Sequence, residues 1–276
     1  MPEPSPLLPV RAVRALADGG AEVTVGLGEA LFEGHFPGHP TLSAIGQLAV
    51  VEAALEAWSG KAKPVASVGR MRLSRRVEGG EVTVRLAGDG EGARFSLVAG
   101  GETASSGTVG VRAGGPSGRP GPAGTGAGRF RPGGGAGSEV VLPHAGVARM
   151  LAGGIEAEGE RVVAEAVLGE ESPFAGLGRR DGQAPAWVGI EMAAQAAAAL
   201  EIVQGAGSDG GGRLGYLVRL REIRCRCDAL PVGTPVRLEV VRGAAVATLR
   251  SYEARALVEG AELLTGELSV FFEPAG

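Results

Sequence analysis

A glycine- and proline-rich stretch divides this chain into two parts. Residues 114–138 read GGPSGRPGPAGTGAGRFRPGGGAGS and hold eleven glycines and four prolines in twenty-five positions. Such a segment cannot bury enough apolar surface to offset the entropy of ordering, so its composition predicts a flexible linker. We therefore expect one domain at 1–113 and a second at 139–276, both of ordinary domain size.

The two parts repeat one order of elements. In the first, strand-like runs precede a helical pattern at 44–58, and four alternating runs follow it. In the second, strand-like runs precede a helical pattern at 186–203, which starts after Pro185, and four more runs follow. This repetition predicts an internal duplication of α+β class, with one long helix against an antiparallel sheet in each part. We expect the two helices to pack against each other near a pseudo-twofold axis.

The composition argues against several classes of protein. Hydrophobic residues make up 44% and charged residues 21% of the chain, which permits a real core. A net charge of −4 and few aromatic residues argue against nucleic-acid binding. We expect no signal peptide and no membrane span, because no apolar run approaches about 20 residues. Cys225 and Cys227 are too close together to staple a fold, so we expect free thiols and a cytoplasmic location.

A histidine-containing motif stands just ahead of the first predicted helix. Residues 32–40 read FEGHFPGHP. This stretch resembles the Gly-His-Phe-Pro-Gly-x-Pro loop of the 3-hydroxyacyl-thioester dehydratases of fatty-acid synthesis, which have the hotdog fold. The resemblance implies that His35 is catalytic and that Phe36, Pro37 and Gly38 shape the loop around it.

The second part carries the marks of a different subfamily. It reads LPHAG at 142–146, SPF at 172–174 and PAWVGIEMAAQ at 185–195. These segments resemble the dehydratase subfamily of aryl-polyene-type gene clusters, and the first part looks closer to the partner subfamily. The resemblance implies that Glu191 is the catalytic carboxylate, supported by Gln195. It also implies a tandem, or double, hotdog fold that forms an intramolecular pseudo-dimer.

Each part lacks what the other keeps. In the family the acid lies fourteen residues after the histidine, and that position here is Ala49. The second part has no histidine after His144. Family active sites lie at a dimer interface, with histidine from one subunit and carboxylate from the other. We therefore expect one composite site, made of His35 and Glu191, and a dead counterpart that pairs Ala49 with apolar residues near Leu177.

These residue types suit the removal of water from a 3-hydroxyacyl thioester. A neutral imidazole is a usable base at neutral pH. A carboxyl group in an apolar tunnel should have a raised pKa, and could protonate the departing hydroxyl. Backbone N–H groups where the helices begin, at Ala44 or at Ala186 and Trp187, could stabilise the enolate-like oxygen. No metal or cofactor is expected.

Other polar residues have plainer interpretations. His39 is expected to be a loop residue, and His144 a structural hydrogen-bonding residue in a turn. Glu33 and Glu52 are rival acids, which we expect to be solvated or on a helix surface.

Arginines cluster in each half. The first cluster holds Arg70, Arg72, Arg75 and Arg76, and the second holds Arg219, Arg221, Arg224 and Arg226. Alternating arginines are typical of a solvated sheet face. They could equally dock an acidic acyl carrier protein or a coenzyme A phosphate, because arginine suits phosphate geometry. The sequence leaves both interpretations open.

The leading hypothesis is a dehydratase. It would convert 3-hydroxyacyl groups on an acyl carrier protein to trans-2-enoyl thioesters in polyene, polyketide-like or fatty-acid synthesis, and chains could assemble further. A hotdog thioesterase is an alternative, although it would not need the histidine loop. A non-catalytic protein that binds acyl chains, or acts as a scaffold, is a third.

Overall fold

The computed structural model describes residues 5–35, 38–88, 91–112, 140, 142–177, 182–205 and 215–273. The predicted linker at 114–138 lies outside the described residues, and so do the loop residues Phe36 and Pro37. The division into domains at that linker therefore stays a prediction.

Each half contains one long helix and six strands of the main sheet. The first half comprises β1 (Val10–Ala15), β2 (Ala21–Gly26), α1 (Ala44–Ser59), β3 (Val65–Leu73), β4 (Glu81–Gly88), β5 (Gly92–Ala99) and β6 (Glu102–Val111). The second comprises β7 (Leu151–Glu158), β8 (Arg161–Ala166), α2 (Gly189–Val203), β10 (Gly215–Cys225), β12 (Val236–Val246), β13 (Leu249–Val258) and β14 (Ala261–Phe272). Two short strands that the sequence did not predict, β9 (Gln183–Pro185) and β11 (Ala229–Pro231), pair separately.

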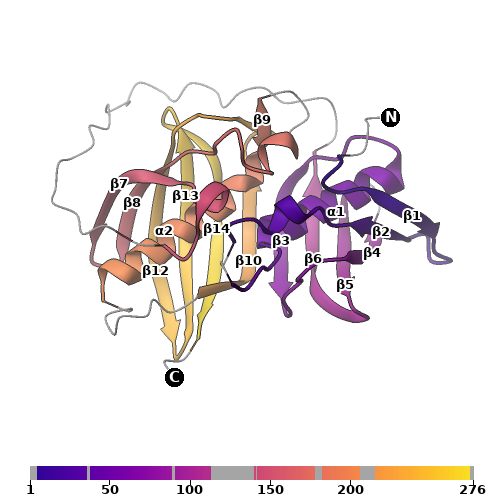
Figure 1. Ribbon diagram of the computed structural model, residues 1–276, viewed down its shortest axis with the longest axis horizontal. Coiled ribbons are helices and arrows are strands. Elements are labelled where there is room, and N and C mark those ends of the chain that lie inside the picture. The colour runs from indigo at the N-terminus through magenta and orange to yellow at the C-terminus, as the bar shows by residue number, and fades with distance from the viewer. Residues whose placement is uncertain are drawn as a thin grey trace.

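One antiparallel sheet of 12 strands runs through both halves (Figure 1). Its order is β1-β2-β4-β5-β6-β3-β10-β14-β13-β12-β8-β7, so the second half repeats the strand order of the first in reverse. The joint is the antiparallel pair β3–β10, in which Met71 lies opposite Leu220. Two helix-on-sheet units related in this way confirm the α+β double hotdog expected from the sequence.

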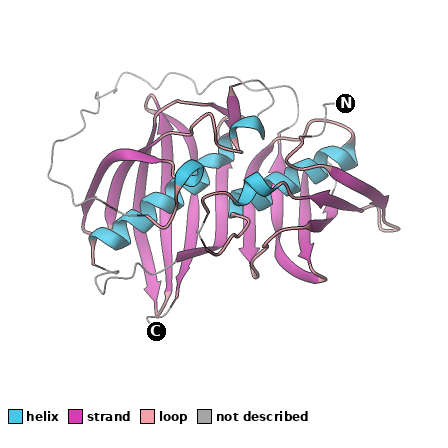
Figure 2. Ribbon diagram, in the orientation of Figure 1, coloured by secondary structure: helices cyan, strands magenta, loops and turns pink. Residues whose placement is uncertain are grey.

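The relation between the two helices differs in part from the expectation. Both lie on the same face of the sheet, but they follow one another along it rather than running side by side (Figure 2). The strand pair β3–β10, and not a helix pair, makes the continuous connection between the halves. The two helices do contact each other, as expected, but the main-chain ladder of the sheet carries most of the connection between the halves.

The first helix begins and ends at residues suited to those positions. The Ser43 side chain accepts a hydrogen bond from the Gly46 N–H at 3.1 Å, which caps one of the N–H groups that the first turn leaves unpaired. Gly60 ends the helix in the left-handed conformation, with φ of 65°. Residues 44–51 are buried without interruption, so the first two turns are enclosed on every side.

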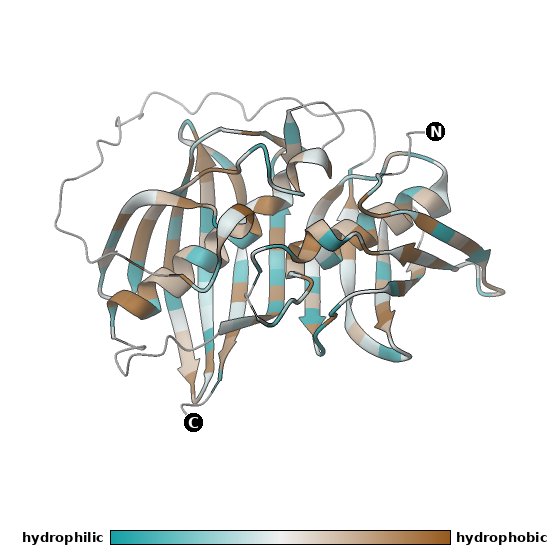
Figure 3. Cartoon of the chain, in the orientation of Figure 1, coloured by the Kyte–Doolittle hydropathy of each residue, from teal (hydrophilic) through white to brown (hydrophobic). Residues whose placement is uncertain are grey.

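The second helix begins later than predicted. Ala186–Val188 form a short 3-10 turn after Pro185, and the α-helix starts at Gly189. The segment Ala186–Val203 is long and apolar enough to span a membrane by length and composition, but 78% of it is buried inside the protein. Alternating hydrophilic and hydrophobic positions along the strands, seen in Figure 3, give the sheet the face against which both helices pack.

Both cysteines are free and buried, as expected. Burial raises the pKa of the Cys225 thiol to about 12. The thiol of Cys227, whose pKa burial also raises, lies 3.3 Å from the Ala229 carbonyl oxygen, to which it donates a hydrogen bond. Neither thiol is therefore a ready nucleophile at neutral pH.

Candidate active site

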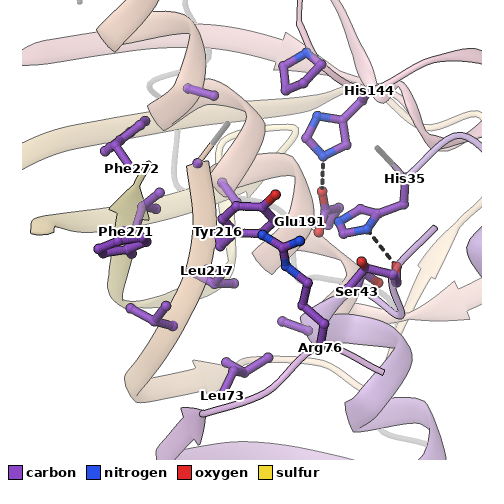
Figure 4. A pocket seen from close by; sticks show the side chains of 18 of the residues that line it. His35, Ser43, Leu73, Arg76, His144, Glu191, Tyr216, Leu217, Phe271 and Phe272 are labelled. Atoms are coloured by element: carbon purple, nitrogen blue, oxygen red, sulfur yellow. Dashed lines mark hydrogen bonds and ion pairs between the residues drawn. The ribbon is translucent and has the colours of Figure 1, made fainter. Parts of the chain in front are cut away.

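A cavity of about 260 Å³ lies where the two halves meet. The first half contributes His35, Ala44 and Gln47, and the second contributes His144 and Glu191. Figure 4 shows His35 and His144 on either side of Glu191. The cavity continues along α2 as far as Glu201, ten residues beyond Glu191 and so about 15 Å along the helix.

Gly34 fixes the loop that carries His35 against the other half. Its carbonyl accepts a hydrogen bond from the Ala145 N–H at 3.0 Å. Its φ is +74°, and a Cβ at this position would lie 2.0 Å from the Ala145 carbonyl oxygen. Only glycine fits this approach, and the contact brings His35 next to His144.

The His35 ring is held in a single tautomer. Its Nδ1 lies 2.8 Å from the Thr41 carbonyl oxygen, which can only accept a hydrogen bond. Nδ1 therefore carries the proton, and Nε2 keeps its lone pair. Burial lowers the pKa of His35 below its usual 6.5, and nearby Glu191 opposes that shift only in part. The ring is thus a neutral base at neutral pH.

Glu191 projects from the first turn of α2 and is 6% exposed. Its Oε1 lies 3.0 Å from His144 Nε2 and accepts a hydrogen bond from Gln195 Nε2 at 3.3 Å. Gln195 also donates to the Ala148 carbonyl at 2.7 Å and accepts from the Met150 N–H at 2.9 Å. Gln195 therefore ties the carboxylate to the segment that carries His144, in the supporting place expected of it.

The charge state of Glu191 differs from the expectation. Burial by itself would raise its pKa, but the hydrogen bond and charge of His144, with smaller contributions from His35 and Gln195, lower it to about 2. The predicted raised pKa is therefore wrong. Apolar neighbours in sequence indicated a dry site, whereas the polar partner that decides the pKa comes from a distant loop.

The structure brings together the two residues expected to form a composite site, and adds a third. Side-chain nitrogen or oxygen atoms of His35, His144 and Glu191 all lie within 4.8 Å of one another. The rings of His35 and His144 are 5.4 Å apart between centroids. His144, for which the sequence favoured a structural role in a turn, is a cavity residue. Its position in the LPHAG segment was the available signal.

Only one of the expected backbone donors fits this cavity. Ala44 lines it at the first position of α1, where N–H groups have no intrahelical acceptor. The Ala186 N–H instead donates to the Asp228 carbonyl at 3.0 Å, so the prediction for Ala186 is wrong. Trp187 is buried and is not among the residues that line this cavity, so its main-chain N–H does not serve it either.

The expected counterpart of this site, at Ala49 near Leu177, stays a prediction; Ala49 itself is buried in the core. Ala49 and Leu177 line neither of the cavities described near His35. Glu52 Oε2 accepts hydrogen bonds from the Trp187 indole at 3.1 Å and from the Val65 N–H at 2.8 Å. Glu52 is thus half-buried on α1 and joins the two halves; of the two places expected for it, solvent or a helix surface, it has the second. Glu33, Gly38 and His39 are exposed, as loop residues should be.

The four arginines of the first cluster separate into two groups. Arg70 and Arg72 lie on β3 and face outward, opposite Arg221 and Arg219 of β10. Arg75 and Arg76 follow the end of β3 and line the cavity. The strand ends at Leu73, so Arg75 and Arg76 lie beyond the alternation that places Arg70 and Arg72 on one face.

Comparison with solved structures identifies the fold as that of double hotdog dehydratase domains. The dehydratase domain of RzxB from Pseudomonas fluorescens matches with a TM-score of 0.66 and 12% identity, over 98% of each chain. The dehydratase domain of PpsC from Mycobacterium tuberculosis, solved with C12:1-CoA, matches with a TM-score of 0.65 and 13% identity, over 96% of this chain and 98% of that one.

The family follows from the second half. Residues 138–275, half of the chain, match the ApeP-like family, described as ApeP dehydratase. The chain therefore belongs to the ApeP-like family of dehydratases. The dehydratase heterocomplex ApeI:P from Xenorhabdus doucetiae matches 48% of this chain and 88% of its own, with 24% identity and a TM-score of 0.43. No curated protein sequence matches the chain.

Proposed function

We propose that this dehydratase converts 3-hydroxyacyl groups on an acyl carrier protein to trans-2-enoyl thioesters, at one composite site per chain. The observation that carries the proposal is the meeting of His35, from the first half, with Glu191, from the second, in one cavity. Family membership gives the reaction class, and the similarity to polyketide dehydratase domains supports a place in polyene or polyketide-like synthesis.

His35 is the base in this scheme. Its Nε2 lone pair takes the C2 proton, while the Nδ1–H stays hydrogen-bonded to the Thr41 carbonyl oxygen and holds the ring plane fixed. The enolate-like charge that develops on the thioester oxygen is stabilised by N–H groups at the start of α1, near Ala44. The electrons of the C2–H bond then form the C2=C3 double bond as hydroxide departs from C3.

Glu191 positions the leaving group. A carboxylate accepts a hydrogen bond from the 3-hydroxyl, and the contacts from His144 and Gln195 keep it in one orientation. With a pKa of about 2, however, Glu191 alone has no proton to give at neutral pH. The proton that turns hydroxide into water must therefore come from a group around it.

The test is a reconstitution with 3-hydroxyacyl carrier-protein substrates, followed by mass spectrometry of the acyl group. We expect loss of one water from the wild-type substrate, and none with His35→Ala or Glu191→Gln. Release of free acid would instead indicate a thioesterase. Unchanged acyl groups, with retained binding, would indicate a non-catalytic acyl-binding protein.

The arginines beside the cavity support an acidic carrier protein as partner. Arg76 lies over the Tyr216 ring at 4.2 Å and pairs with Glu273 at 2.8 Å, which places a fixed guanidinium on the cavity wall. Arg75, which pairs with Glu102, lies beside it. We propose that these two dock the carrier, with Arg70 and Arg72 extending the basic surface outward.

Salt and substitution test this docking. Exposed charges are screened within about 8–10 Å at physiological ionic strength, so the apparent KM should rise steeply with salt. Arg75→Ala and Arg76→Ala should raise KM for the carrier-bound substrate more than they lower kcat. Arg70→Ala and Arg72→Ala, on the outer sheet face and outside the cavity lining, should give smaller rises in KM. An unchanged KM in all four variants would leave the arginines as solvated surface.

A further inference from the structure

His144 is a buried histidine whose proton the reaction as written so far does not use. It is 8% exposed, and it lies in the loop ahead of β7, on the same side of the cavity as the segment held by Gln195. Its Nε2 is 3.0 Å from Glu191 Oε1. This is a charge-assisted contact between groups that both face the place where the substrate must lie.

The two oxygens of Glu191 are used differently. Both of its hydrogen bonds within the described part of the chain, from His144 and from Gln195, end on Oε1. Oε2 makes none there, and Glu191 lines the cavity. The carboxylate therefore has one oxygen committed to the protein and one available to a substrate hydroxyl.

We propose that His144 and Glu191 act as one acid unit that holds a single proton between them and delivers it through Glu191 Oε2 to the departing 3-hydroxyl. This inference rests on the proposed function. The proton on His144 with Glu191 ionised, and the proton on Glu191 with His144 neutral, are two forms of the same protonation state of a coupled pair. The pair can thus supply a proton although Glu191 alone is ionised.

The step balances without any further reactant. The C2 proton moves to His35 Nε2, the electrons of that C–H bond form C2=C3, and the C3–O bond breaks. The leaving oxygen takes the shared proton and departs as water. His35 then holds one proton more and the His144–Glu191 pair one fewer, and transfer between them restores the resting site.

Other charged groups around the cavity have partners of their own. Arg75 pairs with Glu102, and Arg76 pairs with Glu273. Glu201, at the far end of α2, accepts from Arg250 at 2.6 Å and from the Tyr252 hydroxyl at 2.9 Å. Within the described residues, the titratable groups close to His144 are His35, from the loop ahead of α1, and Glu191, from α2.

The first test compares the pH–rate profiles of His144→Gln and Gln195→Met. Both substitutions remove a donor to the same oxygen, but only the first removes the group that shares a proton. We expect the basic limb of kcat to move to lower pH in His144→Gln, with a loss of about 10–100-fold at pH 8 and a smaller loss at pH 6. Gln195→Met should lower the rate evenly across this range. An unmoved limb in His144→Gln, with an even loss of rate, would overturn the proposal.

The second test is decided on the wild-type protein, with Glu191→Gln as a comparison. The chain has three histidines, and nitrogen NMR of 15N-histidine distinguishes a ring with one N–H from a ring with two. We expect His144 to carry protons on both nitrogens at pH 7, and on one only in Glu191→Gln. A singly protonated His144 beside an ionised Glu191, whose charge state is given by the 13C shift of its carboxyl carbon, would contradict the shared proton.

The two proposals can fail separately. If His144 is doubly protonated but the protein dehydrates no 3-hydroxyacyl substrate, the proposed function is wrong and the proton sharing between His144 and Glu191 still holds. If the enzyme dehydrates its substrate, but His144 is singly protonated beside an ionised Glu191 and the basic limb of kcat does not move in His144→Gln, the proposed function holds and the shared proton is wrong.

Discussion

The cavity at His35 and the counterpart region at Ala49 occupy equivalent places in the two halves, yet they have opposite characters. The first holds three titratable side chains around open space. The second holds Ala49, 4% exposed, and a hydrogen bond between the Trp187 indole and Glu52 that ties the halves together. If the proposed site at His35 is the working one, a duplicated fold is free to use the other place for cohesion, and the hydrogen bond between Trp187 and Glu52 links the two halves.

The largest expected effect comes from removing the acid–base residues. His35→Ala and Glu191→Gln should each lower kcat by about 10²–10⁴-fold, because each removes a group that moves or positions a proton. The double variant should be little slower than either single one, since residues that act as a unit are not additive. The measurement is single-turnover dehydration, with circular dichroism as a check on folding. If Glu191→Gln dehydrates at the normal rate, the carboxylate is not needed for the reaction, and the expected difference between the cavity at His35 and the region at Ala49 is contradicted.

A smaller loss should follow from disturbing the contact between the halves at Gly34. Gly34→Ala places a methyl group 2.0 Å from the Ala145 carbonyl oxygen, so the loop must shift away from His144. Gly38→Ala is the matched control: its φ of +86° gives a comparable backbone strain, but its Cβ would meet nothing within 4 Å. We expect a kcat about tenfold lower in Gly34→Ala than in Gly38→Ala, because small misplacements of catalytic groups are costly. Equal rates would mean that the contact does not position His35.

The acidic limb of the pH profile sharpens the role of His35. Burial lowers its pKa below 6.5, so it is neutral above that pH and gains a proton only at lower pH. We expect kcat/KM to be level down to about pH 6.5 and to fall below it, as protonation removes the base. The stability linked to neutral His35 is present above pH 6.5, and is lost as the pH falls through the lowered pKa. Activity that begins to fall well above pH 6.5 would contradict this assignment.

The smallest effect should appear in the counterpart region. Trp187→Phe removes the indole N–H from Glu52, and should lower the free energy of unfolding by about 1–3 kcal/mol without slowing dehydration. Trp58→Phe, at the other tryptophan, is the control for the loss of ring size. Urea denaturation measures both variants. A slower reaction in Trp187→Phe, at unchanged stability, would mean that the region still serves catalysis.

Features that depend on a short stretch of sequence, or on a family motif, were predicted from the sequence. The start of α1 was predicted to the residue, because helical periodicity and the histidine loop ahead of it lie within a short window. The pairing of His35 with Glu191 followed from complementary losses in the two halves. These inferences need only the order of residues and a shared fold.

What the sequence missed depends on contacts between distant segments. The role of His144 and the low pKa of Glu191 arise from one contact between a loop and a helix 47 residues apart. The link from Glu52 to Trp187 joins positions in different halves. The Ala186 N–H is occupied by a carbonyl that only the tertiary fold brings near. Sequence periodicity predicts secondary structure and cannot predict such contacts between distant residues.

The joint between β3 and β10 has a consequence for the halves as separate molecules. Each of these strands is hydrogen-bonded to the other along its length, with Arg219 opposite Arg72 and Leu220 opposite Met71. Cutting the chain between the halves would turn both into open edges, with unpaired N–H and C=O groups beside a buried apolar row. Exposed edges of that kind recruit any available strand, so each half expressed alone should aggregate or pair with itself. Expressed together, the two halves would shield each other's edges, and covalent continuity would then serve chiefly to keep the right partner close.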